Sequence, residues 1–450
     1  MALPDVGKSS LFYPLVYWTA YLYYSLYYRS FTVIGKENIP SDKPVIFASN
    51  HQNALMDALS IGLAARRKVV FLARADLFKK KFLARILFFL RMLPVYRMRD
   101  GISTMGQNEA TFRMAAKVLK AGTPLVLFPE GDHAGFKRLR SLKKGICRIA
   151  FQAEESSGFT LDLHIVPSGI DYSNYSNPGA RLLVKYGKPI RIADFVPLYK
   201  ENPQKALTAL RDKLSEALEP LMINISNEEY YDGYIEICLL YGPEQLKRKQ
   251  LANTHPNRLI IEQEIISQLD KAMPKHKSIF DSFNIENGKY KELLKKVGLR
   301  DWLVQKNNTR AGLFMLDSLV SLVLLPLHLY GLILNYMPYK LPLRFTRNVK
   351  DPVFLSSIHY GIGLLLFPIY YLVIWVIFSL LTKGLLIKLL FALSLPLSGI
   401  FTFYYYIHLL KLKGRFRFLK LRFTAKNSYD SIVETRKKLL LKIEEIINTH

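Results

Sequence analysis

The sequence contains little cysteine, little acidic charge relative to basic charge, and no recognisable secretion signal. Its two cysteines, Cys147 and Cys238, lie far apart and outside any Cys-x-x-Cys pattern, which excludes a disulfide framework and a cysteine-based zinc site. Residues 1–30 begin with few basic residues and contain no small-residue cleavage site, so a removable signal peptide is not expected. The Gly-x-Ser-x-Gly motif is absent around Ser168, and this serine is therefore not predicted to be a nucleophile.

The shortage of acidic residues gives the chain a strongly basic character. Its 36 Asp and Glu residues stand against 63 Lys and Arg residues, and the formal net charge is +27. This charge is typical of proteins that bind nucleic acid or anionic lipid surfaces. Half of the residues are hydrophobic and 13% are aromatic, which a lipid-bound protein explains and a nucleic-acid binder does not. We therefore expect anionic membrane lipids as partners, and no nucleic acid.

A length of 450 residues exceeds a typical single domain, and composition divides the chain into regions. Leu11–Tyr28 is apolar, dense in tyrosine and ended by Arg29, which predicts a helix at the membrane interface; a full span and a buried core helix are the alternatives. The predicted regions are an N-terminal membrane-interface helix (1–30), an α/β domain (31–225), a helical insertion or linker (226–310), membrane-embedded helices (311–410), and a basic tail with a C-terminal amphipathic helix (411–450).

Residues 31–225 alternate between strand-like and helix-like patterns. Strands are predicted at 45–48, 69–73, 125–128, 161–166 and 182–186, and helices at about 54–66, 79–91, 104–121, 141–155 and 203–222. This alternation predicts an α/β fold with a mixed, largely parallel sheet flanked by helices. The helical stretch Phe78–Arg91 combines lysine and arginine with bulky apolar residues, which fits either packing on the sheet or an interfacial amphipathic helix.

Three apolar runs of roughly bilayer-spanning length lie in the C-terminal part, at 312–336, 360–381 and 385–410. The 337–357 loop and the tail after residue 410 are basic, so both are expected on the cytoplasmic side, and the last two runs would form a membrane hairpin. Asp317, Pro326 and His328 disfavour a clean span in the first run. We therefore predict that 312–336 re-enters or lies in one leaflet, which keeps the α/β domain cytoplasmic.

The rest of the α/β domain is organised around Ser49-Asn50-His51, which follows a predicted strand and precedes a predicted helix. Asp57 lies six positions after His51. A carboxylate there can fold back across the turn, hold one imidazole nitrogen and leave the other as a base. This is the base half of a Ser-His-Asp arrangement in which a substrate hydroxyl takes the place of the serine. The alternative is a capping Asn50 beside a half-buried histidine without catalytic function.

Three further stretches carry polar groups at strand ends. Leu93–Gly101 places Arg97 before a helix, where its guanidinium can clamp a phosphate or remain a solvated surface group. Leu125–Pro129 is followed by Glu130-Gly131 and then by a basic loop that precedes a predicted helix. The N-terminus of this helix, flanked by basic residues, would be a ready site for an anion. The alternative is a capping glutamate beside a basic loop that faces lipid. In His164–Asp171, a strand is predicted to end in a Pro167-Ser168-Gly169 turn.

In this order and spacing, the four stretches resemble the glycerophospholipid acyltransferase family. Asn50-His51 with Asp57 resembles its first block, Leu93–Arg97 the second, Phe128–Gly131 the third, and Val166-Pro167 the fourth, and the resemblance covers about residues 40–190. Five residues separate His51 from Asp57, where the commoner family pattern has four; the longer spacing is similar to a branch with fungal-type glycerol-3-phosphate and dihydroxyacetone-phosphate acyltransferases. Asp132-His133 also departs from the family, so Lys137, Arg138 and Arg140 are the candidate phosphate-binding residues.

The resemblance implies acyl transfer by a histidine–aspartate pair. His51 would be the general base, and Asp57 would hold its imidazole. The substrate-binding residues would be Asn50, Asn53, Arg97, Glu130, Gly131, Lys137, Arg138 and Arg140. Acyl-CoA or acyl carrier protein would be the co-substrate, with no metal or redox cofactor, since no tight ligand spacing supports a metal site at His51, Asp57 and His133.

The predicted function is sn-1 acylation of glycerol-3-phosphate by a membrane-bound enzyme, giving lysophosphatidate in early phospholipid synthesis. Acylation of a lysophospholipid such as lysophosphatidate, or of dihydroxyacetone phosphate, is the alternative within the class. A membrane-anchored binding protein with a degenerate acyltransferase domain is the alternative from another class. A bacterial cytoplasmic membrane is favoured over the endoplasmic reticulum because no eukaryotic targeting signal is recognised.

Overall fold

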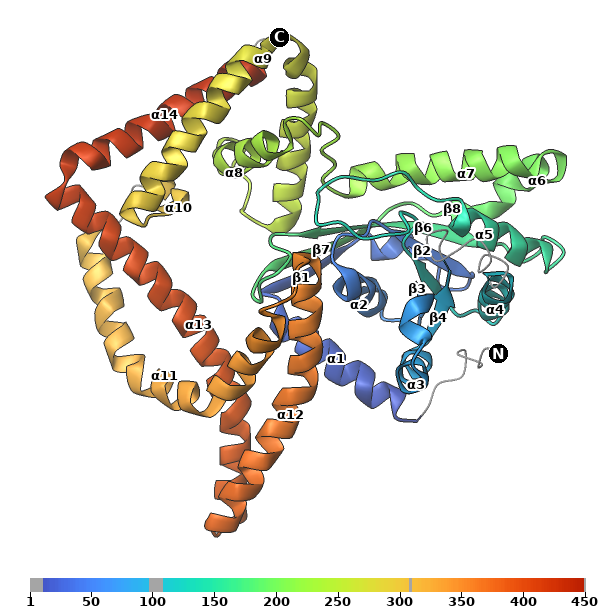
Figure 1. The fold of residues 1–450 in the computed structure, drawn as a ribbon, viewed down its shortest axis with the longest axis horizontal. Coiled ribbons are helices and arrows are strands. Elements are labelled where there is room, and N and C mark those ends of the chain that lie inside the picture. The colour runs from blue at the N-terminus through green and yellow to red at the C-terminus, as the bar shows by residue number, and fades with distance from the viewer. Residues whose placement is uncertain (1–10, 97–107, 307–309, 449–450) are drawn as a thin grey trace. The chain divides into compact units, whose positions relative to one another are not determined.

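A computed structural model of the chain describes residues 11–96, 108–306 and 310–448 (Figure 1). These residues form two compact units, which are described separately. The first unit contains the described residues up to Ser226 together with Asn348–Tyr360, and the second contains Asn227–Arg347 and the residues from Gly361 onward. A short stretch from the C-terminal half of the sequence is therefore part of the first unit.

The first unit is built on one sheet with the strand order β1-β7-β6-β2-β5-β3-β4, and β8 pairs with β6. Five of its strand pairs are parallel, whereas β6 pairs antiparallel with β7 and with β8. The mixed, largely parallel α/β sheet predicted from the sequence is thus confirmed. The strands are β1 (Ser30–Ile34), β2 (Val45–Ser49), β3 (Val70–Arg74), β4 (Met92–Val95), β5 (Leu125–Leu127), β6 (His164–Tyr172), β7 (Arg181–Tyr186) and β8 (Ile190–Arg191).

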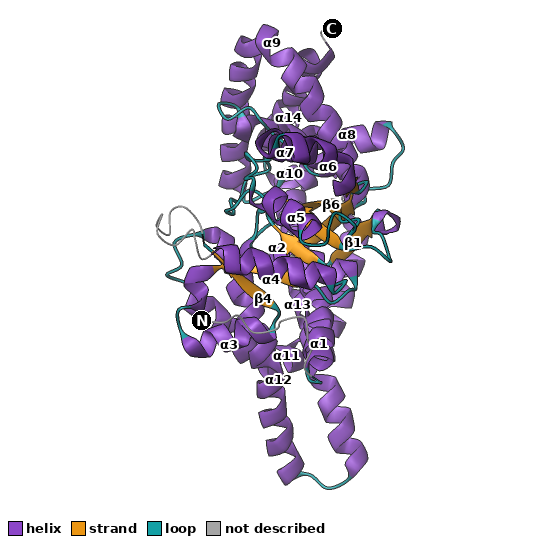
Figure 2. Cartoon of the chain, turned by 90° about the vertical axis from the view of Figure 1, so that its right-hand side faces the viewer, coloured by secondary structure: helices purple, strands orange, loops and turns teal. Residues whose placement is uncertain are grey.

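Helices flank this sheet, and Figure 2 shows the strands in orange among them. They are α1 (Tyr13–Tyr27), α2 (Ala54–Ala65), α3 (Lys81–Phe89), α4 (Asn108–Lys120), α5 (Gly145–Glu155), α6 (Val196–Glu201) and α7 (Pro203–Leu218). The core packs Ile46 and Ile165 of the sheet against Leu119, Ala150 and Leu210 of α4, α5 and α7. All five residues of β2 are buried, as expected of a central parallel strand that is covered on both faces.

The predicted turn at Pro167-Ser168-Gly169 is wrong, because β6 continues through these residues to Tyr172. Pro167 and Ser168 are in register with Ala48 and Ser49 of β2, and the strand then pairs with β7. Gly169 is needed for close packing rather than for a turn. A Cβ atom at this position would lie 2.1 Å from the carbonyl oxygen of Leu221, in the 3-10 helix η6 (Glu219–Leu221).

The helices α1 and α3 each leave an apolar face uncovered within the first unit. Tyr24 of α1 points inward, and its hydroxyl lies 2.7 Å from the Ser60 hydroxyl, whereas Trp18 and Leu22 are each 61% exposed. Tyr13 of α1 contacts the ring of Phe89, so the two helices are neighbours. Exposed leucine, phenylalanine and tryptophan side chains, together with the basic residues Lys79–Lys81, are typical of helices that lie at a lipid interface.

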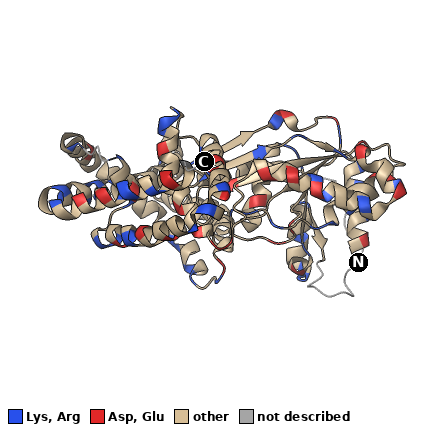
Figure 3. Ribbon diagram, turned by 90° about the horizontal axis from the view of Figure 1, so that it is seen from above, with Lys and Arg blue, Asp and Glu red and all other residues tan. Residues whose placement is uncertain are grey.

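The second unit is helical throughout its described residues. Its polar part contains α8 (Tyr231–Arg248), α9 (His255–Val297), α10 (Asp301–Lys306) and α14 (Lys426–Asn448). Phe280 and Leu439 are among its buried core residues, and Figure 3 shows basic and acidic residues interspersed along its helices. Several of these charges are paired between helices, for example Arg436 with Glu244 and Lys442 with Glu286.

The apolar part contains α11 (Ala311–Thr346), α12 (Leu355–Leu381) and α13 (Leu385–Thr424), and the first turns of α12 belong to the first unit. By length and composition, all three helices can cross a membrane. The antiparallel pair α11–α13 carries a polar seam: Asp317 pairs with Arg415, Ser321 lies 3.1 Å from His408, and the Asn335 amide bonds to Ser398. Figure 1 shows that α11 is curved, and three prolines lie inside it.

Candidate active site

The site begins where the central strand β2 ends and passes into α2. Asp57 lies in the first turn of α2, and its Oδ2 atom is 2.8 Å from His51 Nδ1. The same oxygen accepts the backbone N–H groups of Gln52 at 2.6 Å and of Asn53 at 2.7 Å. Asp57 is wholly buried, whereas the His51 side chain is 16% exposed. The imidazole is therefore the member of the pair that a substrate can reach.

A buried hydroxyl network lies beneath Asp57. Tyr172 of β6 donates its hydroxyl to Asp57 Oδ1 at 2.8 Å, and the Ser60 hydroxyl lies 3.0 Å from that of Tyr172. Burial raises the pKa of Tyr172 well above its usual value, so this hydroxyl stays protonated and can donate. Sequence reasoning missed Tyr172, because it reaches Asp57 from 115 positions away, in the part of β6 that continues beyond its pairing with β2 and pairs with β7.

Aromatic rings enclose the His51 imidazole on two sides. The Phe128 ring stacks on it with centroids 4.1 Å apart, and the His133 ring meets it edge-on with centroids 5.5 Å apart. Burial and the nearby His51 lower the pKa of His133, which favours a neutral ring. Phe128 and His133 were not predicted as site residues, although both lie within one residue of the Pro129–Asp132 stretch.

Glu130 joins the His51 loop to the basic loop. Its Oε1 atom accepts the His51 backbone N–H at 2.9 Å, and its Oε2 atom accepts Arg140 Nε at 2.7 Å. Burial raises the pKa of Glu130, and the Arg140 ion pair and the His51 N–H oppose this rise. Gly131 follows with a φ of +76°, a left-handed conformation that glycine adopts without strain. The turn returns the chain toward the site.

The cationic candidates differ in their surroundings. Arg140 also donates to the Asp132 carbonyl. Lys137 pairs with the buried Asp171 at 3.1 Å. Arg138 is half-buried. Arg97 lies outside the described residues, so the structure does not place it.

The two asparagines near His51 bond mainly to the protein itself. Asn50 is fully buried, donates to the Ile170 carbonyl at 2.9 Å and accepts its N–H at 2.7 Å, which fixes the end of β2 against β6. Asn53 is also buried, donates to the Tyr175 carbonyl at 2.9 Å and accepts the Ser356 hydroxyl at 2.7 Å. Both side chains therefore hold the His51 loop in place.

The arrangement provides a partly exposed imidazole whose Nδ1 is held by a buried carboxylate. Such an imidazole can accept a proton through Nε2 while the carboxylate stabilises the charged ring. Cations from the 137–140 stretch lie in the same unit, on the loop that Glu130 ties to His51. The geometry therefore suits deprotonation of a hydroxyl that belongs to an anionic substrate.

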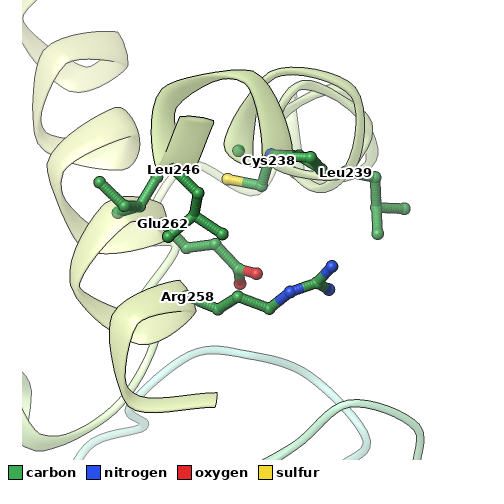
Figure 4. Close-up of a pocket in the computed structure, with 8 residues that line it drawn as sticks. Cys238, Leu239, Leu246, Arg258 and Glu262 are labelled. Carbon is green, nitrogen blue, oxygen red and sulfur yellow. The ribbon is translucent and has the colours of Figure 1, made fainter. Parts of the chain in front are cut away.

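A separate pocket lies in the second unit between α8 and α9, and Figure 4 shows Cys238, Leu246, Arg258 and Glu262 around it. None of the site residues predicted from the sequence lines this pocket. The candidate active site of this chain is therefore the His51 region of the first unit.

A sequence profile described as acyltransferase matches residues 30–171. Over 45% of its length, the chain is 24% identical to a chloroplast 1-acyl-sn-glycerol-3-phosphate acyltransferase of Arabidopsis thaliana, and it spans about half (52%) of that relative. It is 26% identical over 41% of its length to a 1-acyl-sn-glycerol-3-phosphate acyltransferase of Bacillus subtilis, of which 86% is covered. It is also 25% identical over 34% of its length to a glycerol-3-phosphate O-acyltransferase of Saccharomyces cerevisiae, of which 21% is covered.

Proposed function

We propose that this protein is a membrane-bound O-acyltransferase of glycerolipid synthesis, because an acyltransferase profile matches residues 30–171 and the similar proteins of Arabidopsis and Bacillus are named 1-acyl-sn-glycerol-3-phosphate acyltransferases. The observation that carries the proposal is the His51–Asp57 pair, with 2.8 Å between Nδ1 and Oδ2. The membrane setting is supported by the three apolar helices α11, α12 and α13.

The proposed reaction uses His51 as a general base. Its Nε2 takes the proton of an acceptor hydroxyl while the hydroxyl oxygen attacks the thioester carbonyl carbon of acyl-CoA or acyl carrier protein. The C–S bond then breaks, and the thiolate takes the proton back from the imidazolium. Asp57 stabilises the charged ring, and a positioned base of this kind contributes roughly 10² to 10⁴ in rate.

We propose glycerol-3-phosphate as the acceptor, acylated at position 1 to give lysophosphatidate. Arg140, Lys137 and Arg138 supply positive charge for its phosphate. The alternative acceptor is lysophosphatidate, and it is favoured by the names of the Arabidopsis and Bacillus relatives. Dihydroxyacetone phosphate is the third acceptor to test. The non-catalytic alternative is disfavoured by the buried carboxylate that holds the partly exposed imidazole.

The proposal further places the first unit on the cytoplasmic side of a membrane, where acyl-CoA and acyl carrier protein occur. A bacterial cytoplasmic membrane is our preferred location. The basic residues between α11 and α12, and those after residue 410, support this orientation because basic loops remain cytoplasmic.

The decisive experiment measures thiol release from palmitoyl-CoA by the full-length protein in detergent. Glycerol-3-phosphate, lysophosphatidate and dihydroxyacetone phosphate are supplied in parallel, and acyl carrier protein is the second donor. We expect acceptor-dependent release that falls by roughly 10²-fold or more in His51→Ala. His164→Ala, which changes a half-buried histidine at the start of β6, is the matched control and should retain the wild-type rate. No release with any donor and acceptor, or equal release by His51→Ala, would contradict the proposal.

A further inference from the structure

The segment that precedes and begins α12 contacts the His51 loop within the first unit. Ser356 donates its hydroxyl to Asn53 Oδ1 at 2.7 Å, and both residues are buried. The Phe354 ring meets the His133 ring edge-on with centroids 4.7 Å apart. A Cβ atom at Gly135 would lie 3.3 Å from the Val353 side chain. Residues 351–356 therefore form one wall of the region around His51.

Asp351 brings a carboxylate to this wall in a fixed orientation. Its Oδ1 atom accepts the Val353 N–H at 3.0 Å and caps the 3-10 helix η7 (Pro352–Phe354). Its Oδ2 atom lies 3.9 Å from His133 Nε2, and the Asp351 side chain is 50% exposed. The carboxylate is therefore held at the surface of the site by its own capping bond.

His133 is positioned between His51 and this carboxylate. Its side chain is only 11% exposed, and its Nδ1 lies 3.9 Å from Asp132 Oδ1. Both nitrogen–carboxylate distances exceed the usual hydrogen-bond length of about 3.2 Å. A hydroxyl oxygen roughly 2.8 Å from each of two atoms bridges a gap of about 4 Å when its two hydrogen bonds are nearly perpendicular. The 3.9 Å gap between His133 and Asp351 thus has the size that a bridging hydroxyl requires.

The charges next to His133 favour a hydroxyl group there over a phosphate group. Asp132 and Asp351 flank His133, and two carboxylates disfavour a phosphate group on this side. Arg140 and Lys137 lie on the basic loop that Glu130 ties to His51, and they attract the phosphate. Carboxylates accept hydrogen bonds from hydroxyl groups readily. A hydroxyl group of the acceptor therefore suits the surroundings of His133 better than its phosphate does.

We propose that His133 and Asp351 form a hydroxyl-binding subsite that selects an acceptor with a second free hydroxyl next to the one that is acylated. The hydroxyl donates its single proton to Asp351 Oδ2 and accepts a hydrogen bond from the N–H at His133 Nε2, so the bridge uses the imidazole tautomer that is protonated on Nε2. This inference rests on the proposed acyltransferase function. It adds a specificity determinant from a segment outside residues 30–171.

The test compares glycerol-3-phosphate with 3-hydroxypropyl phosphate, which has the same phosphate and primary hydroxyl but no second hydroxyl. The full-length protein in detergent is assayed by thiol release from palmitoyl-CoA. We expect wild-type kcat/KM to favour glycerol-3-phosphate by roughly 10- to 100-fold, as for a lost hydrogen bond to a charged group. In Asp351→Asn, and in His133→Phe, the preference should fall to within about 3-fold, mainly through the KM for glycerol-3-phosphate.

The variants are chosen to preserve the local structure. Asparagine retains an oxygen that can cap η7, and phenylalanine retains the ring contacts of His133 with Phe354 and His51. Asp42→Asn, at an exposed carboxylate of the same unit, is the control and should keep the wild-type preference. An unchanged preference in both variants, an equal loss with both acceptors, or no preference in the wild type would each overturn the inference. Absence of His51-dependent release with any acceptor would instead contradict the proposed function itself.

Discussion

At the scale of single residues, Asp57 is the centre of the candidate site. Its carboxylate accepts hydrogen bonds from His51 Nδ1, from two backbone N–H groups and from the Tyr172 hydroxyl. Four donors on one fully buried carboxylate leave it little freedom to rotate, so the imidazole is also held in one orientation. A preorganised base of this kind does not have to be reoriented when the substrate binds.

We predict that Tyr172→Phe lowers both stability and turnover. The change removes the 2.8 Å bond to Asp57 Oδ1 and leaves a buried carboxylate oxygen without its donor. The loss should lower the free energy of unfolding by about 1.5–3 kcal/mol and lower kcat roughly ten-fold. The measurements are thermal denaturation in detergent and the thiol-release assay at saturating acceptor.

Tyr186→Phe is the matched control for this prediction. Tyr186 is also buried, but its hydroxyl donates to the Ile61 carbonyl at 3.3 Å. This variant should lose about 1 kcal/mol of stability and keep kcat within about two-fold of the wild type. Equal losses of kcat in the two variants would show that Tyr172 acts only through general stability.

The residues that were predictable from the sequence are those close together along the chain. His51 and Asp57 are six positions apart, so a strand-to-helix turn suffices to bring them into contact. Tyr172 and Ser356 reach the same loop from 115 and 303 positions away, respectively. Their placement depends on strand register and on the return of a distant segment, and neither leaves a local pattern in the sequence.

At the scale of secondary-structure elements, apolar runs located the inner strands. The runs at 45–48, 125–128 and 182–186 correspond to β2, β5 and β7, because buried parallel strands are continuously apolar. The short β8 and the half-buried β1 were missed, since strands at the margin of a sheet carry a weaker apolar signal. The continuation of β6 was missed because proline and glycine usually indicate a turn.

We predict that Gly169→Ala destabilises the first unit. The added Cβ atom would lie 2.1 Å from the Leu221 carbonyl oxygen, so β6 and η6 would have to separate. Overpacking of this kind lowers stability by about 1–3 kcal/mol. Thermal denaturation of the full-length protein measures the effect.

Gly145→Ala at the start of α5 provides the comparison. No heavy atom lies within 4 Å of a Cβ atom built there. Alanine also favours a helix, so this variant should be as stable as the wild type or more stable, within about 1 kcal/mol. A Gly169→Ala protein as stable as the wild type would contradict the close approach of β6 and η6.

At the scale of the whole molecule, the curved helix α11 bears on membrane topology. Asp317, near its start, pairs with Arg415 of α13, and Asn335 bonds to Ser398 further along the antiparallel partner. Tyr339 then stacks on Phe403, which lies back toward Arg415 along α13. His328, near the middle of α11, contacts Thr402 and Tyr405 of α13, so these contacts do not distinguish a spanning α11 from a re-entrant one, and the re-entrant segment stays a prediction from the sequence.

We predict that only the connection between α12 and α13 reaches the external side. Single cysteines would be introduced as Arg310→Cys, Asn348→Cys and Lys383→Cys after replacement of Cys147 and Cys238. In intact cells, an impermeant maleimide should label the Lys383→Cys protein alone, and permeabilisation should expose the other two, because basic segments remain inside. Labelling of Arg310→Cys but not Asn348→Cys in intact cells would show instead that α11 crosses the membrane.

The discontinuity of the first unit also imposes an order on biosynthesis. Residues up to Ser226 emerge from the ribosome first. Asn348–Tyr360 emerge only after Asn227–Arg347, the first part of the second unit, has been made. Domains fold as units during synthesis once their residues are available. The wall that Asp351, Phe354 and Ser356 add beside His51 therefore forms after α11 has been translated, so a nascent chain released before that point lacks this wall.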